Sequence, residues 1–318
     1  MIMNELRNVS SSPHFRSKTD TKSIMLDVIL AMLPAMALSV YRFGVRSLLI
    51  IFVTVGFAVL SEYLWNLLMK KPQTVQDLSA VVTGVILALN MPPEIPLWVP
   101  AIGAVFAIIV VKQLYGGIGQ NFMNPALAAR CFLLISFAGL MNDFSCAKIG
   151  FDAMTGATPL AMARTGDMWH YSLFDLFLGN IPGTIGEVSA LALLVGGAYL
   201  LITKVINWRI PVTYIGVFAV FVYIFGYHDF YQVAYQVLSG GLIFGAFFMA
   251  TDYATSPITV KGQFVYAAFL GLLTGIFRLF GGAPEGVSYA IILGNLVVPL
   301  IEKYTIPKAF GKGGKAKK

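Results

Sequence analysis

Charged residues are scarce in this sequence, and their scarcity excludes most soluble architectures. Only 12% of the 318 residues are charged and 58% are hydrophobic, whereas a soluble domain is nearer to a quarter charged. Many stretches reach the roughly 20 apolar residues that a helix needs to cross a bilayer. The apolar runs are continuous, unlike the alternating segments of a β-barrel, and an open sheet cannot face lipid. We therefore expect an all-α polytopic membrane protein.

Cysteine and histidine are also rare, which limits the metal chemistry. Cys131 and Cys146 are the two cysteines, and they form no C-x-x-C pair, so we predict no iron–sulfur, zinc or other metal site within this chain. His14, His170 and His228 all lie outside the apolar stretches, which argues against a two-histidine haem. A nucleotide-binding G-x-G-x-x-G that opens a helix after a strand is absent as well.

The apolar stretches predict ten membrane spans. Their ranges are 22–40, 45–69, 75–90, 96–113, 124–140, 185–205, 210–227, 234–250, 262–279 and 287–303. Two spans are interrupted, one at Pro92, where proline cannot continue a helix, and one over residues 250–257. The polar tail 1–21 precedes the first span, the polar interval 141–184 separates the fifth from the sixth, and the basic tail 304–318 follows the tenth.

The positions of lysine and arginine predict the orientation in the membrane. With the N-terminus inside, sixteen of the 22 basic residues fall on the inner side and five on the outer side, and Arg130 lies within a span. Basic residues gather on the cytoplasmic side of membrane proteins. We therefore predict cytoplasmic termini and an extracytoplasmic 141–184 interval. The net charge of +7 follows from this asymmetry, so we do not expect nucleic-acid binding.

A spacing pattern predicts an internal repeat. Pro92 and Gly116 are separated by the same distance as Pro257 and Gly281, and the two pairs are offset by 165 residues. The same shift carries the first span onto the sixth and the second onto the seventh. Five is an odd number, so the repeats 22–140 and 185–303 would be inverted, with functional sites near the midplane where helices are interrupted. This pattern alone would equally suit a secondary transporter or a channel.

The 141–184 interval contains the motif Asp-Ala-Met-Thr-Gly-Ala-Thr at 152–158. Gly156 and Ala157 would leave the hydroxyl of Thr158 unshielded and let a bulky partner approach the backbone. Asp152 could hold a metal ion or orient a hydroxyl, as phosphoryl transfer to an alcohol requires. These residues alone leave two interpretations open, a phosphoester on Thr158 or an ordinary turn.

The pattern Asp-x-x-Thr-Gly-Ala-Thr resembles the flavinylation motif of membrane flavoproteins in Rnf complexes and Na⁺-pumping NADH:quinone reductases. The resemblance covers the ten predicted spans and the stretch Gly-Gly-Ile-Gly-Gln-Asn-Phe-Met-Asn-Pro-Ala at 116–126. The chain is thus similar to the NqrB/RnfD family of ion-translocating oxidoreductase membrane subunits. The Rnf branch is favoured, because the additional N-terminal sequence of the quinone-reductase branch is absent here.

The resemblance implies an electron-carrying subunit. In that family a separate flavin transferase uses FAD to attach FMN, through its phosphate, to the last threonine of the motif. Thr158 matches that threonine, and Asp152, Thr155, Gly156 and Ala157 match its recognition frame. A second, noncovalent flavin between the spans is implied too, without assigned residues.

The family also implies an assembly and a location. The complex passes electrons from reduced ferredoxin to NAD and moves Na⁺ or H⁺ across the bacterial inner membrane. The partners would be the B, C, G, E and A subunits of an Rnf complex, and these would handle NAD and ferredoxin. A transporter or channel, and an assembly subunit without a cofactor, remain as alternatives.

Charged residues within spans are costly and are candidates for function. Asp27, Glu62, Arg130 and Asp252 are the main cases. Asp252 lies at a helix interruption, where free carbonyls and hydroxyls suit a hard cation, and a helix-capping network is the alternative. The candidate ion path consists of Asp252, Thr251 and Thr255. Arg130 could pair with an acid or with a flavin phosphate. The asparagines expected to join helices by hydrogen bonds are Asn90, Asn124 and Asn295.

Overall fold

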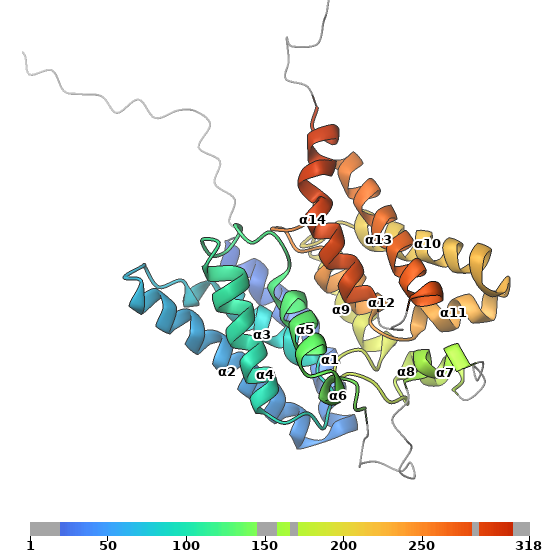
Figure 1. Ribbon diagram of the computed structural model, residues 1–318, viewed down its shortest axis with the longest axis horizontal. Helices are drawn as coiled ribbons and strands as arrows, with labels where there is room; N and C mark the ends of the chain where they lie inside the picture. The colour runs from blue at the N-terminus through green and yellow to red at the C-terminus, as the bar shows by residue number, and fades with distance from the viewer. Residues whose placement is uncertain (1–19, 145–157, 166–170, 282–285, 308–318) are drawn as a thin grey trace, which may run out of the picture.

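A computed structural model describes residues 20–144, 158–165, 171–281 and 286–307, and within these ranges every regular element is a helix (Figure 1). The first part of the chain forms α1 (Thr21–Phe43), α2 (Val45–Leu68), η1 (Val75–Asp77), α3 (Ser79–Leu89), α4 (Trp98–Val105), η2 (Phe106–Gln113), α5 (Pro125–Ser136) and α6 (Ala138–Met141). Two short helices follow, α7 (Pro159–Thr165) and α8 (Leu173–Leu178). The last part forms α9 (Ala190–Ile202), α10 (Arg209–Val222), η3 (Tyr223–Tyr227), α11 (Phe230–Leu238), α12 (Leu242–Phe244), η4 (Gly245–Met249), α13 (Val260–Phe280) and α14 (Val287–Thr305).

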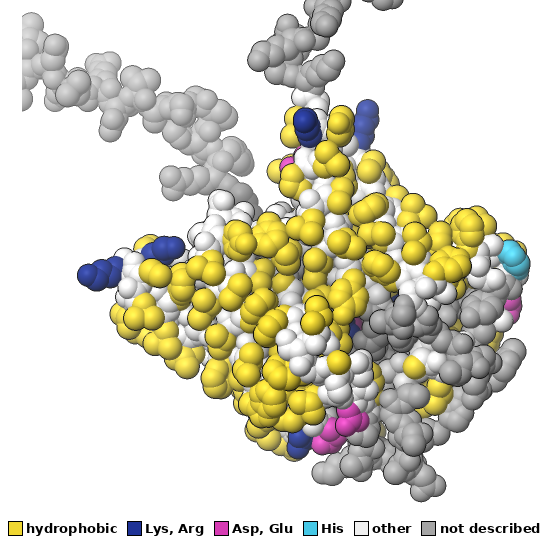
Figure 2. Space-filling view, in the orientation of Figure 1, with side chains coloured by type: hydrophobic (Ala, Val, Ile, Leu, Met, Phe, Trp, Pro, Cys, Tyr) yellow, Lys and Arg dark blue, Asp and Glu magenta, His cyan; other side chains and the backbone are white. Residues whose placement is uncertain are grey.

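Five helices in the described ranges are long and apolar enough to cross a membrane. They are α1, α2, α10 extended to Gly226, α13 and α14, with 18 to 24 residues each. The pair formed by α11 and the segment Leu242–Met249 could supply a sixth span, bent by 65°. Most of the visible surface is hydrophobic, and charged side chains gather near its edges (Figure 2). The prediction of an all-α polytopic membrane protein is therefore confirmed.

Four of the ten predicted spans are shorter than expected. The apolar helices Ser79–Leu89, Trp98–Gln113, Pro125–Ser136 and Ala190–Ile202 all fall below 18 residues. The 11 residues of α3 rise about 16 Å, roughly half the hydrocarbon thickness. The helix ends there because Pro92 and Pro93 cannot continue it. Helix α9 begins late because the preceding chain runs along the end of α3, where the amides of Ile185 and Gly186 bond the carbonyls of Met91 and Leu89 at 2.9 and 2.7 Å.

The eighth predicted span is broken twice. Its expected interruption over 250–257 is present, since η4 ends at Met249 and α13 begins at Val260. The sequence interpretation placed a continuous helix before that point and was wrong there, because Ser239–Gly241 separates α11 from α12. Gly240 has a φ of +66°, a conformation that side chains with a Cβ rarely adopt. This first break positions the site described below.

The helices form two groups that meet along α1, α5 and α9 (Figure 1). Helix α1 packs against both α2 and α9, α5 packs against α14, and α10 packs against α13. A Cβ added to Gly196 of α9 would lie 2.0 Å from the carbonyl oxygen of Ala31 in α1. Small residues that let helix backbones approach this closely are typical of membrane helix contacts.

Candidate functional site

Thr158 is the one member of the sequence motif that lies within the described residues. It directly precedes α7 and is 8% exposed. Its hydroxyl oxygen accepts a hydrogen bond from the backbone amide of Ala161 at 3.3 Å. The remaining motif residues, Asp152, Thr155, Gly156 and Ala157, lie outside the described ranges. Thr158 is buried, so the expectation of an unshielded hydroxyl was wrong.

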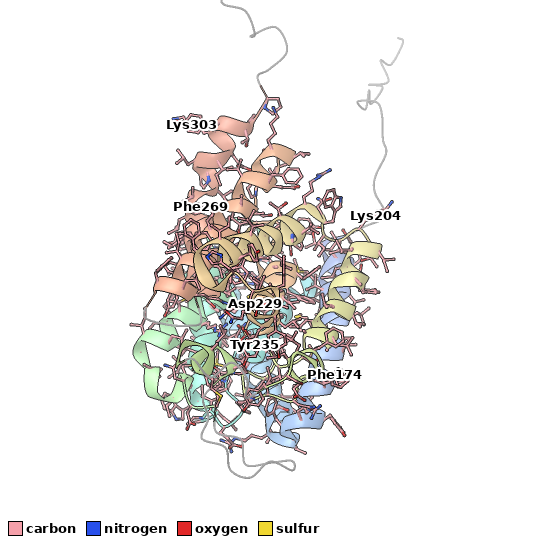
Figure 3. All side chains as sticks on the ribbon, turned by 90° about the vertical axis from the view of Figure 1, so that its right-hand side faces the viewer. Phe174, Lys204, Asp229, Tyr235, Phe269 and Lys303 are labelled. Carbon is pink, nitrogen blue, oxygen red and sulfur yellow. The ribbon has the colours of Figure 1, made fainter. Side chains whose placement is uncertain are left out.

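Leu160 anchors this segment at the break between α11 and α12. Its side chain is 3% exposed and lies against Gly240, where an added Cβ would come within 2.3 Å of Leu160 Cδ1. The Tyr235 hydroxyl donates a long hydrogen bond of 3.5 Å to the Pro159 carbonyl, and Tyr235 lies in the interior of the molecule (Figure 3). A bare backbone at Gly240 is therefore required for Leu160 to fit.

A small apolar cluster continues from this contact and is separate from the main core. It joins α7 to the segment that carries α8 and to α11. Its buried members are Ala163, Tyr171, Leu176, Ile181, Val188 and Tyr235. The cluster holds Thr158 and α7 against the helical body although α7 itself has only 7 residues.

Arg278 is the buried positive charge nearest to Leu160 and Gly240 that the structure describes. It is 3% exposed, and its guanidinium donates hydrogen bonds to the carbonyl oxygens of Gln236 and, at 3.1 Å, Ser239. These carbonyls lie at the C-terminal end of α11, where the helix leaves acceptors without helical partners. Nη2 lies 3.2 Å from the Cβ position of Gly240. Arg278 thus stabilises the break and brings a positive charge to the site.

A second buried arginine joins the two helix interruptions. Arg130 of α5 donates to Asn90 Oδ1 at 2.6 Å and to Glu187 Oε1 at 2.8 Å. Asn90 ends α3, and Glu187 Oε1 lies 2.1 Å from the Cβ position of Gly241 in the other break. The acid expected to pair with Arg130 is therefore Glu187, and Asn90 joins helices as predicted.

Asp252 closes a local turn between η4 and α13. Its carboxylate accepts from the Thr255 hydroxyl at 3.1 Å and from the Ala254 amide at 3.5 Å, while the Thr251 hydroxyl donates to the Phe247 carbonyl at 2.7 Å. These bonds form the capping network that was the alternative to an ion path. Among the described residues, no group of three or more His, Cys, Asp or Glu could hold a metal ion.

A cleft lies between the two groups of helices and contains a cavity of about 100 Å³. Residues from α1, α3, η2, α5, α9 and η4 contribute to its walls. Its polar lining comprises Ser79, Thr83, Lys112, Asn121, Asn124, Thr251 and Asp252, and its aromatic lining comprises Phe247, Phe248 and Tyr253. The cleft therefore combines flat apolar surfaces with hydrogen-bonding groups, as ligand sites do.

Lys112 reaches this cleft from a buried ion pair. Its Nζ lies 2.9 Å from Glu62 Oε2 and 2.5 Å from the Ser79 hydroxyl. Glu62 Oε1 accepts from the Thr74 hydroxyl at 2.6 Å and from Gln113 at 3.1 Å. The charge of Glu62, predicted as a candidate for function, is thus fully hydrogen-bonded. The Asp27 carboxylate likewise accepts a bond of 2.9 Å, from the Tyr199 hydroxyl.

Two titratable groups near α8 have shifted pKa values. The hydrogen bond from the Ser172 hydroxyl, and then that from the Asn180 amide, lower the pKa of Asp175. Burial raises the pKa of Tyr171. Asp175 and Ser172 form a reciprocal capping box at the start of α8, so ionised Asp175 helps to define that short helix.

Comparison with known proteins shows what this chain is similar to. Residues 8–311 match the model of the NQR2, RnfD, RnfE family. A relative from Acetobacterium woodii is 50% identical over 97% of both chains and is named as the D subunit of a Na⁺-translocating ferredoxin:NAD⁺ oxidoreductase complex. A relative from Clostridium ljungdahlii is 40% identical over 98% of both chains and is named as the D subunit of a proton-translocating ferredoxin:NAD⁺ oxidoreductase complex. A relative from Actinobacillus succinogenes, named as the D subunit of an ion-translocating oxidoreductase complex, is 37% identical over 96% of this chain and 98% of its own.

Proposed function

Because the chain belongs to the NQR2, RnfD, RnfE family, we propose that it is the electron-carrying membrane subunit of an ion-translocating ferredoxin:NAD⁺ oxidoreductase. As part of such a complex it contributes to a translocase, and the other Rnf subunits are its partners. Nucleotide and ferredoxin binding are assigned to those partners, because the sequence has no G-x-G-x-x-G that opens a helix after a strand. The cytoplasmic membrane of a bacterium is the proposed location.

The finer part of the proposal is FMN held on Thr158 by a phosphoester. In the attachment step, the bond between the two phosphates of FAD breaks and AMP leaves. A bond forms between phosphorus and Thr158 Oγ1, and the hydroxyl proton passes to a base of the transferase. Once attached, the flavin supplies reversible electron uptake at a fixed place, and protein contacts tune its potential.

The residues around Thr158 suit this group in charge and in placement. A threonine hydroxyl is the acceptor that a phosphoester needs, and Leu160 fixes its position relative to the helical body. The buried guanidinium of Arg278 is the positive charge at the same contact, and arginine is well suited to groups with phosphate charge. Access is limited, since Thr158 is 8% exposed.

Ten spans in two inverted five-helix repeats are also part of the proposal. The helix boundaries support it, since a shift of 165 residues carries α2 onto α10, Trp98–Gln113 onto α13 and α5 onto α14. The same shift carries Asn90 onto Thr255 and Arg130 onto Asn295. Arg130 donates a hydrogen bond to Asn90. With its amide turned toward Thr255, Asn295 likewise donates to the Thr255 carbonyl oxygen at 3.3 Å. In Figure 3, Lys204 and Lys303 lie toward one end of the molecule and Phe174 lies toward the other. This arrangement supports cytoplasmic termini and an extracytoplasmic attachment loop.

Ion transport through this chain would use Asp252, Thr251 and Thr255. Two observations support that path: these residues lie at a helix interruption, and Thr251 and Asp252 line the cleft. The named relatives divide between Na⁺ and protons, so the transported ion of this protein is either of the two. A second, noncovalent flavin would find flat aromatic walls and amide groups in the same cleft.

In-gel fluorescence separates this proposal from a transporter or channel, the alternative that the bent α11–α12 pair favours. The full chain is expressed beside a flavin transferase, denatured, run on a gel and viewed under ultraviolet light. A fluorescent band that is lost in Thr158→Ala and kept in Thr165→Ala supports the covalent flavin. A dark wild-type band beside a flavinylated control protein contradicts it.

A further inference from the structure

We infer that Thr158 becomes available for modification only when the segment Thr158–Ala163 leaves its contact with the α11–α12 break, and that Leu160 controls how often it leaves. We call this segment the attachment segment, and we call its partners Tyr235, Gly240 and Arg278 the seat. The inference rests on the proposed flavin attachment and concerns what the seat does to it. Leu160 and Gly240 are positioning residues in this scheme, because neither would contact the reacting atoms.

The seated arrangement leaves too little room for the attachment reaction. Thr158 is 8% exposed, and its hydroxyl accepts a bond from the Ala161 amide. Phosphoryl transfer needs the attacking oxygen, the phosphorus and the leaving oxygen roughly in line. A transferase must therefore place the diphosphate of FAD directly beside Thr158 Oγ1, with the AMP side pointing away. That approach requires an open face on the threonine, and little of Thr158 is exposed while the segment is seated.

Leu160 makes a well-defined apolar contact for the segment. It is 3% exposed and fills the space above Gly240. Hydrogen bonds of the segment include those from the Ala161 amide to Thr158 Oγ1 at 3.3 Å, from the Met162 amide to the Thr158 carbonyl at 3.0 Å and from the Tyr235 hydroxyl to the Pro159 carbonyl at 3.5 Å. Local segments of a protein can open without global unfolding. A 7-residue helix such as α7 is too short to hold itself in place. Leu160 is therefore the residue whose loss would most favour the open state.

Leu160→Ala with Leu133→Ala as its matched control tests the inference. Both leucines are buried against a glycine, Leu160 against Gly240 and Leu133 against Gly103, but only Leu160 belongs to the attachment segment. The flavin-free full chain is produced without a transferase, then mixed with transferase and FAD, and the initial rate of in-gel fluorescence is measured. We expect Leu160→Ala to react about tenfold faster or more, because deleting buried leucine atoms strongly weakens a packed contact. Leu133→Ala should react at the wild-type rate, and equal rates for all three chains would overturn the inference.

A second readout needs no transferase. Thr158→Cys is placed in a chain that carries Cys131→Ser and Cys146→Ser, and the rate of labelling by a membrane-impermeant maleimide is measured. Phe174→Cys in the same chain is the exposed reference, since Phe174 is 67% exposed. We expect position 158 to react at least about tenfold more slowly than position 174, and Leu160→Ala to remove most of that difference. Equal rates at the two positions without Leu160→Ala would contradict the seat.

The two experiments distinguish this inference from the proposed function. If the chain never becomes fluorescent but its maleimide rates are as expected, the proposed flavin is wrong and the shielding of residue 158 is supported. If every variant becomes fluorescent at the same rate, the flavin is supported and the control by Leu160 is wrong.

Discussion

The buried pair of Lys112 and Glu62 should be one of the most sensitive points of this fold. The two side chains are 4% and 0% exposed, and their charged atoms lie 2.9 Å apart. Lys112→Met keeps an unbranched chain of similar length but removes the charge, so Glu62 retains only the bonds from Thr74 and Gln113. Breaking a buried pair costs about 3–5 kcal/mol, because the remaining charge is stranded. Because two donors to Glu62 remain, we expect the free energy of unfolding to fall by about 3 kcal/mol, the lower end of this range.

Thermal stability in detergent measures this loss. For a chain of 318 residues, a loss of about 3 kcal/mol should lower the midpoint of heat-induced loss of folded protein by roughly 4–5 °C. The exposed Lys71→Met is the control and should change the midpoint by about 1 °C or less. The double variant Glu62→Gln/Lys112→Met should recover much of the loss, since it leaves no stranded charge. A midpoint for Lys112→Met that equals that of Lys71→Met would refute the reasoning.

Three other changes test the packing, the second ion pair and the cap of α8. Gly196→Ala puts a Cβ 2.0 Å from the Ala31 carbonyl oxygen, so α1 and α9 should separate and the yield of folded protein should fall; a wild-type yield would count against that helix contact. Arg130→Gln should lower stability by about 3–5 kcal/mol through the stranded Glu187, with recovery in Arg130→Gln/Glu187→Gln, and a double variant as unstable as the single one would contradict the pair. The lowered pKa of Asp175 means that its contribution is present above the ordinary aspartate pKa and is lost as pH falls through the lowered value. Asp175→Asn should therefore reduce the loss of stability in acid, measured by thermal midpoints from neutral pH downward, and an unchanged pH profile would exclude that role.

The long spans could be predicted from sequence because bilayer thickness limits them. The ranges 45–69 and 287–303 agree with α2 and α14 to within two residues. In each case an apolar run of the required length ends at charged or polar residues. Hydropathy alone carries this information, since the surrounding lipid selects apolar side chains along the whole helix.

The short helices could not be predicted in the same way. Residues 75–90 and 185–205 are apolar enough for spans, yet α3 begins only at Ser79 and α9 begins only at Ala190. The two regions are joined by backbone hydrogen bonds between residues almost 100 positions apart in the chain. Long-range pairing of this kind leaves no periodic signal in the sequence. The break at Ser239-Gly240-Gly241 did leave one, because adjacent glycines are a recognised turn signal.

The sequence named residues of the candidate site but not how they are placed in the fold. The motif identified Thr158, and the burial cost of a charge identified Arg130 and Glu62 as notable. The partner of Arg130, however, is 57 residues away at Glu187. Arg278 lies within the predicted span 262–279 but was counted on the outer side, so its burial beside Gly240 was missed. The low exposure of Thr158 and the packing of Leu160 over Gly240 were missed because tertiary structure alone creates them.

Mass spectrometry of the peptide that contains Thr158 tests the central proposal most directly. The full chain, expressed beside a flavin transferase, is digested and the peptide is fragmented to locate any added mass. We predict an increase of one FMN less one water on Thr158, absent from the same peptide of Thr158→Ala. An unmodified Thr158 in protein from cells that flavinylate a control substrate would contradict the account.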